Sequence, residues 1–65
     1  MTFGDRLHEL RQKRGWTQEH LGRLAMLQGT TISMLEQGNR YPGYLVLRRL
    51  AQAFRLTISE LMEGV

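Results

Sequence analysis

The sequence predicts an all-α fold in which five short helices form one compact domain over residues 1–65. Signals that start a helix recur at even intervals, and the apolar residues between them follow helical spacing. No run of four or more residues alternates with the period of a strand, so we expect no sheet. A chain of 65 residues is long enough for one small domain but not for two.

The first helix is predicted over about residues 3–14. Thr2 is followed three residues later by Asp5, which is the spacing of a capping box. Gly15 supplies a residue that ends a helix in the left-handed conformation. The apolar residues that share one face are Phe3, Leu7 and Leu10.

The second helix is predicted over about residues 18–25, with Thr17 as its N-cap. Trp16 and Leu21 have the spacing of a hydrophobic staple around that cap. The side chains expected to point inward are Leu21, Leu24 and Ala25.

The third helix follows after only two or three residues and covers about residues 29–37. Gln28 is its expected cap, with Thr30 as a competitor, and Gly38 ends it. Ile32 and Leu35 are expected in the core.

A loop over residues 39–43 contains the only proline and precedes a fourth helix over about residues 44–54. The apolar residues of that helix have the spacing i, i+3, i+4, i+7 and are Leu47, Leu50, Ala51 and Phe54. The fifth helix begins at a complete capping box from Thr57 to Glu60, which Leu56 and Leu61 flank as a staple.

The composition excludes several classes of protein. The absence of cysteine rules out disulfides and cysteine-based zinc sites. The longest apolar runs have four residues, far fewer than the ~20 that cross a bilayer, so we expect no membrane association. The first residues have neither the basic nor the apolar stretch of a signal peptide. These features together predict a cytoplasmic protein.

No catalytic or metal-binding pattern is present. His8 and His20 lie on different predicted helices without a second ligand at metal spacing, so both are interpreted as surface histidines. Ser33 has no histidine base at a recognisable spacing. We therefore expect no enzyme activity, no metal, no cofactor and no small-molecule ligand.

The charge balance favours a polyanionic partner. Nine Lys and Arg residues face six Asp and Glu residues, giving a net charge of +3. All but Lys13 of those nine are arginine, whose planar fork of donors matches phosphate well.

Residues 18–37 form the most informative segment. Two helices of about eight residues are joined by a very short turn, and small residues stand at Gly22 and Ala25 where the helices must cross. A tight helix pair of this kind leaves its second helix protruding, and a protruding helix fits the major groove of B-DNA.

The sequence also resembles the helix-turn-helix family of the Cro and phage repressor type. The stretches that carry the resemblance are Thr17-Gln18-Glu19-His20-Leu21, Thr31-Ile32-Ser33, Leu35-Glu36-Gln37-Gly38-Asn39-Arg40-Tyr41-Pro42 and Leu50-Ala51-Gln52-Ala53-Phe54. Their spacing fits without a gap, and the resemblance extends from about Phe3 to Gly64. It implies a five-helix domain whose third helix reads DNA.

The resemblance implies roles for individual residues. Contacts with DNA phosphates are implied for Gln18, Gln28, Gln37, Asn39 and Arg40. Contacts with bases are implied for Gly29, Thr30, Ser33 and Met34. None of these four offers the two-pronged contact that Arg makes with guanine or Gln with adenine.

Three structural features follow from the same resemblance. Arg11 and Glu36 occupy the positions of a semi-buried ion pair between the first and third helices. Met26 and Arg55 stand where the family commonly has glycine, which predicts a positive φ at two non-glycine residues.

Two functions from different classes remain open. The first is a sequence-specific DNA-binding transcriptional regulator that binds double-stranded DNA as a homodimer on a two-fold operator, with Ile58, Met62 and Val65 as the dimer surface. The second is a protein-interaction module, such as an antitoxin or co-regulator, because Gly29 and Met34 are plain recognition residues. The chain is also compatible with being a piece of a longer regulator.

Overall fold

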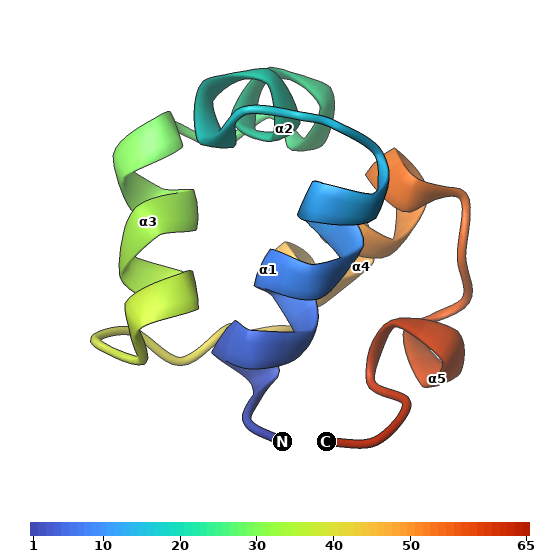
Figure 1. Ribbon diagram of the computed structural model, residues 1–65. Coiled ribbons are helices and arrows are strands. Elements are labelled where there is room, and N and C mark those ends of the chain that lie inside the picture. The colour runs from blue at the N-terminus through green and yellow to red at the C-terminus, as the bar shows by residue number, and fades with distance from the viewer.

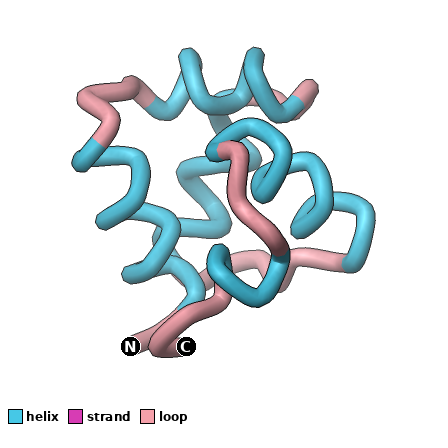
Figure 2. Tube along the Cα trace, turned by 90° about the vertical axis from the view of Figure 1, so that its right-hand side faces the viewer, coloured by secondary structure: helices cyan, strands magenta, loops and turns pink.

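In the computed structural model, which describes residues 1–65, three of the five helices begin at a threonine whose side chain caps the helix. The five helices are α1 (Phe3–Lys13), α2 (Gln18–Ala25), α3 (Gly29–Gln37), α4 (Tyr44–Phe54) and α5 (Ile58–Leu61), and the structure has no strand (Figures 1 and 2). The all-α prediction and its five segments are confirmed, and no helix is long and apolar enough to span a membrane.

The predicted threonine caps account for the starts of α1, α2 and α5. Thr2 and Thr57 each form a complete capping box, and Thr17 accepts a hydrogen bond from the backbone N–H of His20. Gln28 and not Thr30 is the N-cap of α3, but its side chain makes no capping hydrogen bond. The first amide groups of α3 therefore lack a side-chain partner, as is common where a helix end faces solvent or a ligand.

Two turns have the unusual backbone that the sequence predicts. Met26 ends α2 at φ 60° and Arg55 ends α4 at φ 58°, and these are the only non-glycine residues with positive φ. A side chain in this conformation costs roughly 1 kcal/mol or more relative to glycine.

The helices enclose one apolar core at the centre of the bundle. α2 packs against α3 and α4, α1 packs against α3, and α5 packs against α4. The side chains that are almost completely buried are Leu7, Leu21, Ile32, Leu35, Leu50, Phe54 and Leu61. Trp16 lies half-buried at the edge of this core, where its ring stacks on Phe54 with centroids 5.3 Å apart.

The prediction for Leu24 is wrong. Its side chain is 47% exposed, whereas Leu21, Gly22 and Ala25 are buried. Successive side chains turn by about 100° around a helix, so the buried sector of α2 runs from Leu21 to Gly22 and Leu24 falls outside it. Leu47, also expected in the core, packs only partly buried against it.

Two glycines allow helices to approach closely. A Cβ atom at Gly22 would lie 2.6 Å from the carbonyl oxygen of Leu27, so only glycine allows the tight turn between α2 and α3. A Cβ atom at Gly4 would lie 2.5 Å from the carbonyl oxygen of Glu36, where α1 crosses the end of α3. Only the first of these contacts was expected from the sequence.

Candidate nucleic-acid interface

α3 turns one side to the core and leaves the other open. Ile32 and Leu35 are fully buried, whereas Thr30, Met34 and Gln37 are exposed at helical spacing. We call these three residues the outer stripe of α3. No other helix covers the outer side of α3, which lies at the edge of the molecule (Figure 1). The structure thus presents the protruding helix that the short turn predicted.

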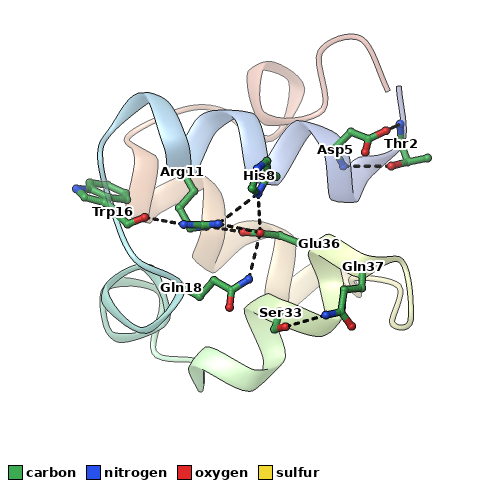
Figure 3. A network of polar contacts seen from close by, with 9 residues as sticks. All are labelled: Thr2, Asp5, His8, Arg11, Trp16, Gln18, Ser33, Glu36 and Gln37. Carbon is green, nitrogen blue, oxygen red and sulfur yellow. Dashed lines mark hydrogen bonds and ion pairs between the residues drawn. The ribbon is translucent and has the colours of Figure 1, made fainter.

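A buried carboxylate joins α3 to α1 and α2. Glu36 accepts hydrogen bonds from Arg11 through Nε at 2.6 Å and Nη2 at 3.1 Å, while its side chain is only 6% exposed. His8 Nδ1 lies 3.0 Å from the same carboxylate, and Gln18 Nε2 donates to it at 3.2 Å (Figure 3). Arg11 also donates to the carbonyl oxygen of Trp16 at 2.7 Å. The predicted Arg11–Glu36 pair is confirmed as the centre of a larger network.

These contacts determine the charge of the pair. Burial disfavours the ionised form of Glu36, but hydrogen bonds from Arg11, His8 and Gln18 outweigh it and lower the pKa of the carboxyl below its ordinary value. The hydrogen bond to Glu36 raises the pKa of Arg11. Both groups are therefore charged at neutral pH, and the pair fixes α1 against the inner side of α3.

Four of the five predicted phosphate-contacting residues lie at the ends of α3 or just beyond them, and the fifth, Gln18, lies at the start of α2. Gln18 is half-buried and bound to Glu36, and Gln28 is exposed at the start of the helix. Asn39 donates to Gln37 at 3.1 Å, and Gln37 donates to Ser33 at 3.3 Å, so these side chains form a short polar chain past the end of α3. Arg40 follows in the exposed loop without an ion-pair partner.

The four predicted base-contacting residues lie on or beside the outer stripe. Thr30 and Met34 belong to it, and Ser33 is half-buried next to them. Gly29 approaches the backbone of α2, where a Cβ atom would lie 3.2 Å from the Cα of Glu19. Packing at the helix crossing therefore gives Gly29 a reason to lack a side chain.

The predicted dimer surface is less exposed than expected. Ile58 and Met62 pack partly buried against the core, and only Val65 is largely exposed. Leu61 is fully buried.

Some residues of this region carried no signal in the sequence. The sequence predicts only an ordinary surface histidine at His8, because nothing along the chain relates it to Glu36, which lies 28 residues away.

Arg6 and Arg14 bind the ends of other helices. Arg6 donates to the carbonyl oxygens of Glu60 and Leu61, and Arg14 donates to that of Phe54 at 2.8 Å.

Known proteins are similar to this chain over almost its whole length. A family model described as a helix-turn-helix domain matches residues 2–63. The HTH-type transcriptional activator BcrR of Enterococcus faecalis is 36% identical over 64 residues, which are 98% of this chain and 31% of that protein. The chain spans between 31% and 56% of the length of the curated relatives that it matches.

Two solved structures are similar over almost the whole chain. The P22 c2 repressor in complex with a synthetic operator has a TM-score of 0.89 and 25% identity, over 100% of this chain and 98% of that one. The restriction-modification controller protein C.AhdI from Aeromonas hydrophila has a TM-score of 0.88 and 35% identity, over 92% of this chain and 91% of that one.

Proposed function

The chain belongs to the helix-turn-helix domain family of the phage repressor type. We propose that it acts as a sequence-specific DNA-binding transcriptional regulator in the cytoplasm. The outer stripe of α3 is the main support for this proposal, because it is open to solvent and free of acidic residues. Glu36, the only acid on α3, is turned inward and neutralised by Arg11. A DNA duplex thus meets no carboxylate on the stripe.

In this proposal α3 lies in the major groove. Thr30 and Ser33 offer hydroxyl groups to base edges, and Met34 offers an apolar contact of the kind that recognises a thymine methyl group. Gly29 lets the backbone approach closely. These contacts discriminate weakly, so DNA shape and bridging water contribute to specificity.

Phosphate contacts fix the position of α3 in the groove. The amides of Gln18, Gln28, Gln37 and Asn39 are neutral donors, and Arg40 adds a positive charge. The start of α2 adds free backbone N–H groups and the positive end of a helix dipole beside Gln18.

We further propose that two copies bind one operator. The Cα atoms of the domain span 24 × 24 × 23 Å. Half-sites lie ~34 Å apart on one face of B-DNA, so two domains placed side by side come into contact once their side chains are included. Val65 and the exposed parts of Ile58 and Met62 are the proposed contact.

Selection of bound duplexes from a random pool tests the proposal directly. An enriched palindrome with half-sites one helical turn apart is the expected result. Replacement of Thr30 and Met34 by alanine should change the enriched bases, whereas replacement of Arg48, which is exposed on α4, should leave them unchanged.

A protein-interaction module is the second candidate. It is favoured by the lack of a two-pronged base contact on α3 and by exposed apolar side chains at Met26 and Tyr41. Titration with duplex DNA over a range of salt concentrations separates the two. Absence of binding even at low salt would favour the protein partner, because phosphate-driven binding is strongest there.

A further inference from the structure

We propose that His8 is a further phosphate-binding residue and that it binds DNA in its doubly protonated form, so that DNA binding takes up a proton. This inference rests on the proposed DNA-binding function and adds a residue from α1 to it.

The position of the ring is fixed by one of its two nitrogens. Nδ1 lies 3.0 Å from the carboxylate of Glu36, which can only accept a hydrogen bond, so we assign the proton of the neutral ring to Nδ1. Arg11 Nη2 lies 3.2 Å from the same nitrogen, and it too donates to that carboxylate oxygen. Nε2 is left without a partner on a side chain that is 53% exposed. A phosphate oxygen is bound by Nε2 only when that nitrogen also carries a proton.

The ring shares a hollow with two predicted phosphate contacts. His8, Gln18, Glu36 and Gln37 line this hollow between α1, the start of α2 and the end of α3. Glu36 lies between His8 and Gln18 (Figure 3). Gln37 belongs both to the hollow and to the outer stripe of α3. A phosphate that reaches the amides of Gln18 and Gln37 therefore comes close to His8.

The charges around the hollow favour the extra proton. Three carboxylates line it, Asp5 and Glu9 from α1 and Glu36 from α3. Three cations from α1 oppose them, because Arg6 and Lys13 pair with Glu9 and Arg11 pairs with Glu36, while α2 contributes only the neutral Gln18. With a neutral His8 these charges balance, so the hollow has no net charge that attracts phosphate. A protonated His8 adds one positive charge, so a bound phosphate and a bound proton favour each other.

This coupling has a measurable size. Imidazole groups change charge between about pH 5 and pH 8, and one linked proton changes the affinity at most tenfold per pH unit. We expect affinity for a short duplex of mixed sequence to fall about three- to tenfold from pH 6 to pH 8. The slope of log affinity against log salt should be steeper at pH 6 by about 0.9, the value for one more neutralised phosphate.

Two variants of His8 separate the role of the charge from that of the fold. In H8N the amide nitrogen stands near the place of Nδ1 and can still donate to Glu36, but no group replaces Nε2. It should bind at pH 6 as weakly as the unmodified protein binds at pH 8. In H8K the charge persists at both pH values, so affinity should stay high and nearly independent of pH. H20N is the matched control, because His20 lies on α2 beside Trp16 and outside the hollow.

Affinities and melting temperatures of all four proteins should be measured at both pH values. Pronounced pH dependence in the unmodified protein and H20N, with little in H8N and H8K, is the expected result. An affinity of the unmodified protein that does not change with pH would overturn the role of His8 while leaving DNA binding intact. The same holds if H8N, folded to the same melting temperature, keeps the full pH dependence. Failure to bind duplex DNA at either pH would instead refute the proposed function itself.

Discussion

Replacement of Glu36 by alanine tests how strongly the buried ion pair holds α1 against α3. The change leaves the guanidinium of Arg11, whose side chain is only 11% exposed, without its carboxylate. Removal of one partner from a buried pair costs about 3–5 kcal/mol. We expect the lower end, about 3 kcal/mol, because Arg11 keeps its hydrogen bond to the carbonyl oxygen of Trp16. A domain of this length has a free energy of unfolding of roughly 3–10 kcal/mol, so the substitution should remove about a third of it or more.

Thermal unfolding followed by circular dichroism measures this loss. A change of 1 kcal/mol shifts the melting temperature of a domain this small by about 4–8 °C, so E36A should melt roughly 12–24 °C lower. The control is the double variant R11M/E36M, which removes both charges and leaves neither unpaired. The loss of unfolding free energy in the double variant should be smaller than the summed losses of R11M and E36M by more than about 1 kcal/mol. If E36A melts within error of the unmodified protein, the pair does not stabilise the fold.

The remaining predictions concern the same fold and interface. The free energy of unfolding should fall as the pH drops through the lowered pKa of Glu36, because the ionised carboxylate stabilises the fold fully only above the pKa that Glu36 has in the unfolded state. In thermal melts at several pH values, E36Q should lose this part of the acid sensitivity. M26G and R55G should each raise the melting temperature by relieving about 1 kcal/mol of backbone strain, and a lower value in both would contradict this. G22A should destabilise the domain and weaken DNA binding, because its methyl group meets the backbone oxygen of the turn. R40A should bind all duplexes more weakly and reduce the salt slope by about 0.9, and an unchanged slope would place Arg40 away from phosphate.

Local signals were sufficient to predict the helices. Thr2, Thr17 and Thr57 satisfy orphan N–H groups within three residues of themselves, so their effect is visible in the sequence. The strained turns at Met26 and Arg55 were predicted from the family resemblance, because they depart from its usual glycines. Both kinds of signal depend on near neighbours or on a known pattern.

Features that depend on the angle between helices could not be predicted in the same way. Leu24 has the spacing of a core residue, but the direction from which α3 packs on Gly22 decides which sector of α2 is buried. The close approach of Gly4 to Glu36 and the contact of His8 with the same residue join positions about 30 residues apart. No spacing rule relates such positions, because they meet only once the fold has formed.

The arginines show why net charge alone is a poor guide to the interface. Arg6 and Arg14 bind the carbonyl groups that end α5 and α4, and Arg11 is buried with Glu36, so the guanidinium groups of all three are engaged within the fold. On the side of α3 the donors are mainly neutral amides, together with Arg40. Neutral donors gain little from long-range attraction and depend on accurate placement. If the chain binds DNA as proposed, the residues that hold α1 against α3 should therefore affect binding even where they touch no DNA.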